Sequence, residues 1–557
     1  GADIEWFHSA RRVAERSVGV TRGGTMNSNE TEKELSKIAT TLSEVRRDLG
    51  RTLQVEPGQP VPVVQPLPDG HISKWLDGKM VDGGSADDIE HAQENAAQAA
   101  DAASRALQAA ANAALYDPTY RLKTVPLLVA SIRAAGGAGT IWQAGSYLYS
   151  EAASAATDHH VTTAGGVKLY VLPIDGAYHF PAFGPALDGV TDDAAILQKM
   201  IDAAPVFGAS DVYLGGKAVS IETKINVPSG IRVNGGSLIG GRTKINWRGV
   251  GADSLYQGVF MIVGATTGAQ LSVSAAAGEF RSGIILTDAS TVAVYDYIVT
   301  QPQAPYTSTS IYAQYFGQVM QKTSNTVALP YDKRLGLGTD CKVQKVNPVT
   351  DVTISGIDFE AFGQTARSNG IGGIYLSYTD RCKVLDCTFK GFWFRGVSFT
   401  FSTNFVCDDT EAMYPAAVGP GEGYNIACTY SHIGVINRAK AWVCRHNTDI
   451  TASSKIEHVD CYAYQTTSAA YLTHHAEEYD IGWTRCHAFA CNMGWALCTI
   501  DPNFASRSWK LRLTDCSSLL STDYALTFAG YGHDLSVKGF RATRTDGASG
   551  YTINLCN

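Results

Sequence analysis

The second half of the chain repeats a short pattern in which apolar and polar residues alternate. One copy is Gly373-Ile-Tyr-Leu-Ser-Tyr378, and its central apolar position recurs at intervals of 22 to 29 residues. Alternation with a period of two predicts β-strands whose apolar side chains all point to one side. The recurring positions are Leu376, Phe399, Cys428, Ile450, Leu472, Leu497, Leu526 and Ile553.

A second recurring pattern has two apolar residues separated by one residue, then Asp or Gly two positions later, then another apolar residue. Its copies are residues 352–357, 382–387, 405–410, 456–461, 481–486, 511–516 and 535–540, whereas residues 433–438 fit it poorly. Two columns that stay in phase about every 25 residues predict a solenoid with one coil per repeat. We therefore expect a parallel β-helix of about eight or more coils. Turn positions are expected at Asp386, Asp409, Asp460 and Asp515.

Helical patterns precede these repeats. Leu35, Ile38, Leu42, Val45 and Leu49 follow the spacing of a coiled-coil seam, and two to three heptads are short for a helix that stands alone. An alanine-rich tract continues the spacing and predicts a second self-associating helix, or alternatively a helix packed on its own domain. The predicted domains are an N-terminal segment with a short coiled coil (1–54), a Pro/Gly-rich linker (55–84), a helical stalk (85–117), a small β-rich neck (118–182) and the β-helix (183–557) with an irregular β insertion at about 236–350.

Composition narrows the function classes. The chain has 557 residues, 45% of them hydrophobic and 18% charged, with a formal net charge of −8. That charge disfavours a nucleic-acid binder, and no apolar run has the length that membrane insertion needs. All twelve cysteines lie between Cys341 and Cys556, without paired CxxC motifs or zinc spacing. We expect buried free thiols, folding in a reducing cytoplasm, no metal site and no cofactor.

Residues 183–196 read Phe-Gly-Pro-Ala-Leu-Asp-Gly-Val-Thr-Asp-Asp-Ala-Ala-Ile. This stretch resembles the motif that precedes the coils of pectate-lyase-superfamily β-helices, a Phe-Gly followed by Asp-Gly-Val-Thr-Asp-Asp and a helix. Segments at 329–331, 345–348 and 352–359 are similar to the approach to the regular coils in the same superfamily. An alanine-rich coiled coil before such a β-helix resembles bacteriophage tailspikes and capsular depolymerases.

The resemblance covers residues 183–557 and implies a right-handed β-helix, usually a homotrimer. It implies a spike in the virion tail, assembled in the host cytoplasm, that binds and cleaves the surface polysaccharide of a bacterium. The N-terminal segment would then attach to a phage tail or baseplate protein. The motif at 183–196 implies the fold and carries no catalysis.

Candidate chemistry comes from the loops of neighbouring coils. Carboxylates on adjacent coils fall near the separations that glycosidases use, and crowding raises the pKa of one of them. Two long loops bring acidic and basic groups to one edge, and Glu478 with Asp501 is the preferred catalytic pair. Glu477 and His475 complete the predicted catalytic group.

Substrate binding is predicted for residues expected on the outer surface. Aromatic rings offer stacking surfaces to sugars, and a cation or carboxylate can bind polar groups. The predicted residues are Tyr375, Tyr471, Tyr479, Arg507 and Asp449.

Three other functions stay open. A lyase would use a base such as His475, Tyr479 or Arg507 on an acidic glycan, which the net charge of −8 slightly disfavours. A non-catalytic receptor-binding fibre would bind glycan without shortening it. A cellular β-helix enzyme such as a pectinase or epimerase fits the predicted stalk least well.

Overall fold

The computed structural model describes residues 71–76, 79–85, 137–163, 165–236, 241–276, 281–301, 314–333, 337, 339–473, 478–497, 509–528, 533–545 and 553–555. The chain divides into two units, Gly1–Ala110 and Ala111–Asn557. In the first unit, β1 (His71–Leu76) and β2 (Lys79–Ser85) pair as an antiparallel hairpin within the segment expected as a linker. The coiled coil expected over residues 35–49 and the stalk expected after Ser85 lie outside the described residues.

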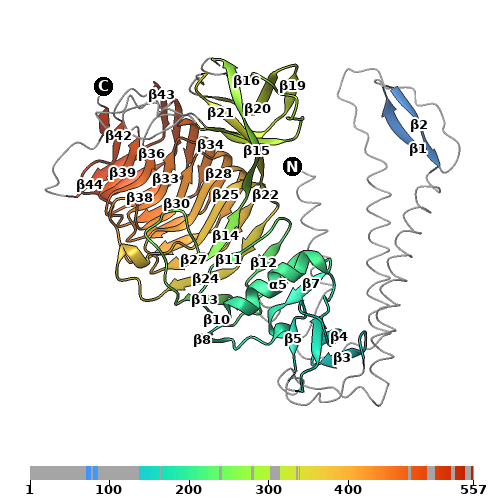
Figure 1. Ribbon diagram of the computed structural model, residues 1–557. Helices are drawn as coiled ribbons and strands as arrows, with labels where there is room; N and C mark the ends of the chain where they lie inside the picture. The colour runs from blue at the N-terminus through green and yellow to red at the C-terminus, as the bar shows by residue number, and fades with distance from the viewer. Residues whose placement is uncertain are drawn as a thin grey trace. The chain divides into compact units, whose positions relative to one another are not determined.

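The second unit is a solenoid of parallel strands, which confirms the predicted β-helix (Figure 1). Its strands form three columns, and each coil contributes one strand to each column. The first column contains β11 (Ile225–Asn226), β14 (Phe260–Val263), β25 (Ile374–Asp380), the start of β28 (Arg395–Asp408), β30 (Tyr424–Thr429), β33 (His446–Thr451), β36 (Ala469–Thr473), β39 (Met493–Leu497), β42 (Leu526–Phe528) and β45 (Ile553–Leu555).

The other two columns complete each coil. The second column contains β7 (Ala177–His179), β9 (Asp211–Tyr213), β12 (Arg232–Asn234), β23 (Thr353–Ser355), β26 (Lys383–Leu385), the end of β28, β31 (His432–Asn437), β34 (Ser454–Val459), β37 (Tyr479–Thr484), β40 (Trp509–Thr514) and β43 (His533–Lys538). The third contains β8 (Asp188–Asp192), β10 (Ala218–Ile221), β13 (Thr243–Trp247), β24 (Ile357–Ala361), β27 (Thr388–Lys390), β29 (Glu411–Met413), β32 (Lys440–Trp442), β35 (Tyr462–Tyr464), β38 (His487–Phe489), β41 (Ser517–Ser521) and β44 (Arg541–Arg544). Short β22 (Val349–Thr350) pairs with the end of β25.

The inward residues of the three columns form one continuous apolar core. The ten described cysteines are free and buried, as predicted, and all nine in the solenoid are core members. Burial raises the pKa of thiols such as Cys387 to about 12, so they behave as small apolar side chains. Because the core is continuous, the inward side chains of each coil pack against those of the coils before and after it.

The first predicted column is correct only in part. Leu376, Phe399, Cys428 and Ile450 lie side by side as predicted, but the residue aligned with Ile450 in the next coil is Thr473. Leu472 is aligned with Asp449 and points outward. Leu526 is inward but belongs, with Ile553, to the row of Trp495, and Ile553 is 46% exposed. The alignment therefore differs from the prediction by one residue at β36, which reverses the side to which Leu472 points, and by two residues at β42.

The second column follows its prediction except in the poorly fitting copy, where residues 434–439 rather than 433–438 align with the copy at 405–410. In β31 the inward position aligned with Phe405 is Gly434, and a Cβ there would come within 2.0 Å of the Phe405 ring. The aromatic ring occupies the space of the missing side chain, so the pattern is broken without leaving a gap. The predicted turn residues have left-handed backbones, with φ of 50° at Asp386 and 54° at Asp460, a conformation that Asp tolerates better than most residues.

A helix precedes the regular coils, as the capping motif predicts. α5 (Ala194–Val206) lies at the N-terminal end of the solenoid and buries Leu197, Met200 and Ile201 (Figure 1). The side chain of Asp192 accepts a hydrogen bond from the Ala194 amide at 3.0 Å. Before it come η1 (Phe180–Phe183) and a four-stranded sheet of β3 (Ile141–Ala144), β4 (Tyr147–Glu151), β5 (Val161–Thr162) and β6 (Lys168–Val171). No helix of the described residues is long and apolar enough to cross a membrane.

A separate seven-stranded sheet interrupts the coils between β14 and β22. It packs on the solenoid through Tyr297, whose hydroxyl donates to the buried Asp380 at 2.5 Å, and through Phe316, which contacts Tyr378. The sheet contains β15 (Ala265–Ala275), β16 (Arg281–Leu286), β17 (Tyr297–Gln301), β18 (Phe316–Gln318), β19 (Gln321–Thr323), β20 (Thr326–Lys333) and β21 (Lys342–Asn347).

After the sheet the chain returns to the solenoid, where the 3-10 turn η2 (Arg367–Asn369) precedes β25.

Candidate functional site

The predicted catalytic group lies only partly within the described residues. Glu478 precedes β37 and is fully buried, and its Oε1 accepts a hydrogen bond from the Ala452 amide at 3.1 Å. Ala452 lies in the turn between β33 and β34 with a φ of 47°, so this carboxylate stabilises the turn. His475, Glu477, Asp501 and Arg507 lie outside the described residues. The pair Glu478 and Asp501 therefore stays a prediction.

The predicted substrate-binding residues are not gathered in one place. Tyr375 and Asp449 lie in one outward row of the first column, Tyr375–Ser398–Ala427–Asp449, but neighbouring side chains cover them almost completely. Tyr471 was expected to point outward, and this was wrong, because its ring is buried in the core against Trp495. It therefore offers no surface to a sugar.

An acidic pair held by one arginine lies on the outer face of the second column. Glu457 of β34 and Asp480 of β37 form ion pairs with the Nη2 and Nη1 atoms of Arg512 in β40. The three side chains are 44%, 30% and 38% exposed, so a ligand in solution can reach them. Because their strands follow one another in the column, the two carboxylates come from adjacent coils, which lie roughly 5 Å apart.

A glycine sets the position of the Glu457 side chain. Gly482 is aligned with Glu457 on one side and with Arg512 on the other. A Cβ on Gly482 would lie only 2.0 Å from Glu457 Oε2, so the carboxylate occupies the space above the bare backbone. The side chain crosses one whole coil in this way to reach the arginine.

The electrostatics distinguish Glu457 from other ion-paired acids of the solenoid. Burial raises the pKa of Glu457 and Asp480 adds to the effect, although Arg512 opposes both. By contrast, Lys244 lowers the pKa of Glu360, and Arg485 lowers the pKa of Asp460. A raised pKa keeps a carboxylic acid protonated closer to neutral pH, as general acid catalysis requires.

A tyrosine–lysine pair lies next to Asp480 in the sequence. The Lys510 ammonium donates a hydrogen bond to the Tyr479 hydroxyl at 2.9 Å and lies 5.1 Å from the centre of its ring. Of the predicted substrate-binding residues that the structure describes, Tyr479 is therefore the one that lies beside the acidic pair. Its hydroxyl can donate to or accept from a sugar, and its ring can pack against one.

A comparison of loops does not find Glu457 and Arg512, because both residues lie within strands. Each occupies the position between the two inward residues of the second pattern, as in Ile456-Glu-His458 and Leu511-Arg-Leu513. The sequence signal that could have revealed them is an acidic and a basic residue at the same outward position of two copies of the pattern that lie two coils apart. In the described residues no group of three His, Cys, Asp or Glu side chains is arranged to hold a metal ion.

No family model and no curated protein matches the chain. Solved structures of similar fold include the tailspike of Pseudomonas phage phi297, with 12% identity, 66% of this chain and 75% of that chain covered, and a TM-score of 0.42. Another is the tailspike of Acinetobacter baumannii bacteriophage AP22 in complex with capsular saccharide, at 12% identity, 69% of each chain and a TM-score of 0.40. A third is the adhesin PfbA of Streptococcus pneumoniae, at 10% identity, 68% of this chain, all of that chain (100%) and a TM-score of 0.33.

Proposed function

We propose that this protein is a tailspike that binds the surface polysaccharide of a bacterium and cleaves it by glycosidic hydrolysis. The observation that carries the proposal is the pair Glu457 and Asp480, which is solvent-accessible, comes from adjacent coils and is held by Arg512. The resemblance of an alanine-rich helical tract followed by a β-helix to bacteriophage tailspikes and capsular depolymerases supports the polysaccharide as substrate.

In this mechanism Glu457 is the general acid that protonates the glycosidic oxygen. Asp480 acts on the opposite side of the sugar, as nucleophile or as the base that activates water. Arg512 orients both carboxylates.

A lyase is the second candidate, favoured by the contact between Tyr479 and Lys510. A tyrosine beside an ammonium group is a suitable base for removing the proton next to a uronic-acid carboxylate, and Arg512 would neutralise that carboxylate.

We further propose a homotrimer that attaches to a phage tail or baseplate protein through its N-terminal segment and acts at the host cell surface.

The test is incubation of the purified protein with capsular polysaccharides and O-antigens from a panel of bacterial strains. Polymer size and ultraviolet absorbance of the products are followed together. Shortening without new absorbance supports the hydrolase, and shortening with it supports the lyase. Binding of a polymer whose length never changes contradicts both and leaves a receptor-binding spike.

A further inference from the structure

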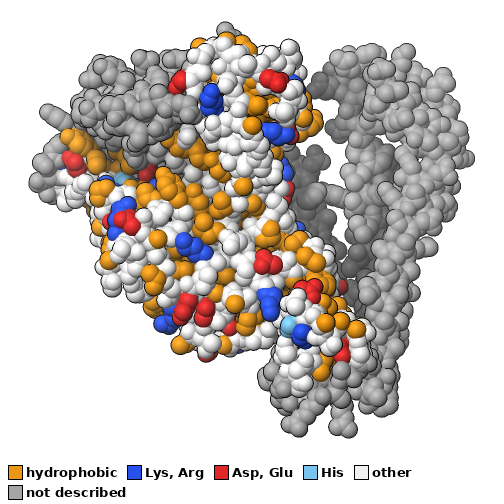
Figure 2. Space-filling view, in the orientation of Figure 1, with side chains coloured by type: hydrophobic (Ala, Val, Ile, Leu, Met, Phe, Trp, Pro, Cys, Tyr) orange, Lys and Arg blue, Asp and Glu red, His pale blue; other side chains and the backbone are white. Residues whose placement is uncertain are grey.

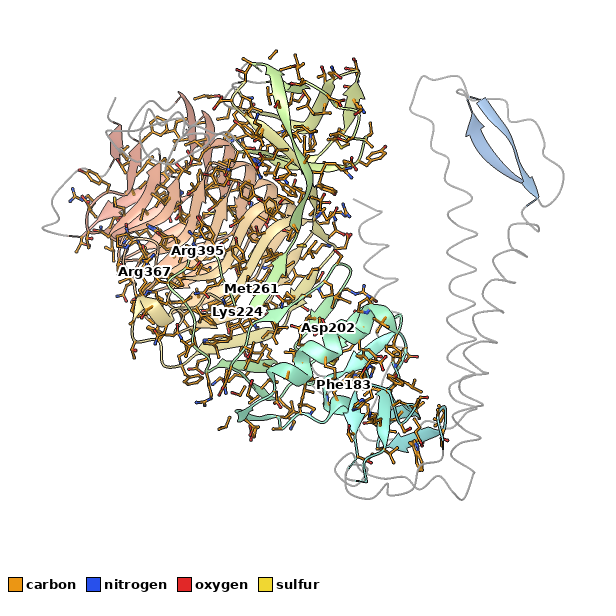
Figure 3. The ribbon with its side chains drawn as sticks, in the orientation of Figure 1. Phe183, Asp202, Lys224, Met261, Arg367 and Arg395 are labelled. Carbon is orange, nitrogen blue, oxygen red and sulfur yellow. The ribbon has the colours of Figure 1, made fainter. Side chains whose placement is uncertain are left out.

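A pocket of about 430 Å³ opens on the surface at the N-terminal end of the solenoid. Three aromatic rings line it, those of Tyr147 in β4, His179 in β7 and Tyr213 in β9. Pro181 of η1 forms part of its wall, two residues before Phe183, which Figure 3 labels. At this end of the second unit, over β3 to β8 and α5, hydrophobic and charged groups lie next to one another on the surface (Figure 2). The pocket has a size typical of sites that bind small ligands.

A tight turn brings a carboxylate to the rim of this pocket. Asp175 and Gly176 have φ of 50° and 72°, and the main chain pairs across them, between Ile174 and Ala177. Two successive residues with positive φ are typical of a type I′ turn, for which Asp-Gly is a preferred sequence. The exposed side chain of Asp175 therefore lines the pocket together with the rings.

The three rings form one apolar surface that a ligand can reach. His179 and Tyr213 are aligned on adjacent coils and stack with centroids 5.4 Å apart and planes inclined by 17°. The ring centre of Tyr147 lies 6.0 Å from that of His179. All three side chains are half-buried, so each keeps part of its surface in contact with solvent. The C–H groups of a sugar pack well against aromatic surfaces of this kind.

The polar groups of the pocket are available to a ligand. The hydroxyls of Tyr147 and Tyr213, the imidazole of His179 and the carboxylate of Asp175 make no hydrogen bond or ion pair with a described residue. Burial lowers the pKa of His179, although Asp175 opposes the effect, so the imidazole is neutral near pH 7 and offers one donor and one acceptor. Among the described residues that line the pocket there is no lysine or arginine. Such a lining favours an uncharged ligand with several hydroxyl groups over an anion.

The pocket and the acidic pair lie on the same column of the solenoid. Asp211, two residues before Tyr213 in β9, is aligned with Glu457 of β34 through six successive strand pairings. Six coils correspond to roughly 29 Å along the solenoid axis. A polysaccharide that follows the second column can therefore contact both sites at once, whereas a short oligosaccharide can contact only one.

We propose that this pocket binds an uncharged sugar unit of the polysaccharide and holds the polymer at a distance from the acidic pair. The inference rests on the proposed function, because the ligand belongs to the same polymer. In the bound state the C–H face of the sugar packs against His179 and Tyr213, and its hydroxyl groups form hydrogen bonds with Asp175 and Tyr147. Binding in the pocket increases the affinity for long chains and takes no part in the chemistry.

The first test measures binding of capsular polysaccharides from a panel of strains by calorimetry. The full chain carries Glu457→Gln, so that cleavage does not interfere. We expect Tyr213→Ala to weaken binding at least tenfold, and Asp175→Asn, which keeps the shape but removes the charge, to give a smaller loss. Tyr462→Ala is the matched control and should bind as well as the parent, because Tyr462 is also an exposed tyrosine in contact with a histidine of the adjacent coil, on the third column.

The second test uses the length of the substrate, in the chain that keeps Glu457. Tyr213→Ala should raise KM for the polymer at least tenfold at unchanged kcat, and should leave cleavage of a trisaccharide fragment of the same polymer unaltered. A lower melting temperature with equal losses for polymer and trisaccharide would make Tyr213 purely structural and overturn the inference. Unchanged polymer binding with an altered oligomeric state would overturn it too, since a second copy of the chain would then occupy the pocket.

The two proposals can fail separately. If polymer binding depends on Tyr213 but the wild type shortens no polymer, the proposed hydrolysis fails and this inference stands. Cleavage of polymers whose binding and KM do not depend on Tyr213 has the opposite meaning.

Discussion

The rings of Tyr471 and Trp495 stack on each other inside the β-helix, with centroids 4.7 Å apart and planes inclined by 19°. The Tyr471 hydroxyl donates a hydrogen bond to the main-chain oxygen of His487 at 3.1 Å. Two large rings on adjacent coils therefore fill the core where the inward positions of earlier coils have smaller side chains, such as Ile426 and Thr448. This contact fixes the register of the coils on both sides.

The contact predicts a specific pattern of stability changes. Tyr471→Ala should lower the free energy of unfolding by about 3–5 kcal/mol, and Tyr471→Phe, which loses only the hydrogen bond, by about 1 kcal/mol. Denaturant unfolding measures both changes. Binding of polysaccharide by Tyr471→Phe should equal that of the wild type, and a loss of binding at unchanged stability would place the ring on the outer surface after all.

Removal of either carboxylate of the acidic pair should abolish most cleavage. Glu457→Gln and Asp480→Asn are each expected to reduce kcat by about 10²–10⁴-fold, because each removes one of the two groups that act on the glycosidic bond. Asp460→Asn, at another ion-paired acid of the same solenoid, is the matched control and should keep full activity. Equal losses in all three variants would point to a structural effect.

The raised pKa of Glu457 gives the expected pH dependence. A general acid acts in its protonated form, so kcat should fall as the pH rises through that pKa. Stability has the same sign, because the folded state binds the proton more tightly than the unfolded state and loses this advantage as the pH rises. A pH–rate profile of the wild type that lacks this basic limb would contradict the assignment of Glu457.

Gly482→Ala tests the geometry of the pair without altering any charge. The added methyl group would occupy the position of the Glu457 carboxylate, since a Cβ there lies 2.0 Å from Oε2. We expect kcat to fall at least tenfold while the ion pair between Arg485 and Asp460 stays intact. The same substitution in the Glu457→Gln background should have little further effect on kcat, and independent losses would show that the two residues act separately.

A buried histidine should make the solenoid sensitive to acid. His458 is fully buried, packs against Trp483 and has a pKa lowered to about 4 by its burial. The unfolded chain binds a proton near pH 6.5 and the folded chain does not, so this contribution to stability is complete above pH 6.5 and is lost as the pH falls towards 4. The free energy of unfolding falls by roughly 3 kcal/mol over this range. His458→Phe should make the denaturant midpoint of unfolding less dependent on pH between 6.5 and 4. If the pH dependence is unchanged, the decline in stability comes from other groups.

The reactivity of the cysteines towards a thiol reagent tests whether they are buried in the core of the solenoid. The ten described cysteines are buried, and burial raises the pKa of those that shift. A thiol reagent at neutral pH should leave them unmodified in the native protein and label them in denaturant without prior reduction. Rapid labelling of Cys387 or Cys407 in the native protein would contradict the packing of the coils.

The amino-acid pattern predicted the solenoid because inward positions must be apolar in every coil. It located the turns at Asp386 and Asp460, since a left-handed backbone restricts the residue type. It did not fix the alignment of β36, where Tyr471 and Leu472 are both apolar enough to point inward. In the structure Tyr471 points into the core, where its ring stacks on that of Trp495, and Leu472 points outward.

The acidic pair could not be predicted by comparing loops. Glu457 and Arg512 are separated by 55 residues and come together because Gly482 leaves room between them. That juxtaposition requires the alignment of three coils to the residue. Glu478, predicted as catalytic because its coil is next to that of Asp501, instead accepts a hydrogen bond from the main chain of the preceding coil.

The seven-stranded sheet leaves the solenoid after β14 and returns at β22, and its first and last strands pair where they begin and end, Ala265 with Asn347. Its two attachment points are therefore neighbours, and the coils on either side stay in contact through β14 and β25. Such an arrangement makes the sheet an exchangeable module. Recombination could replace it by a different module, or by a short hairpin, and leave the alignment of every coil as it was.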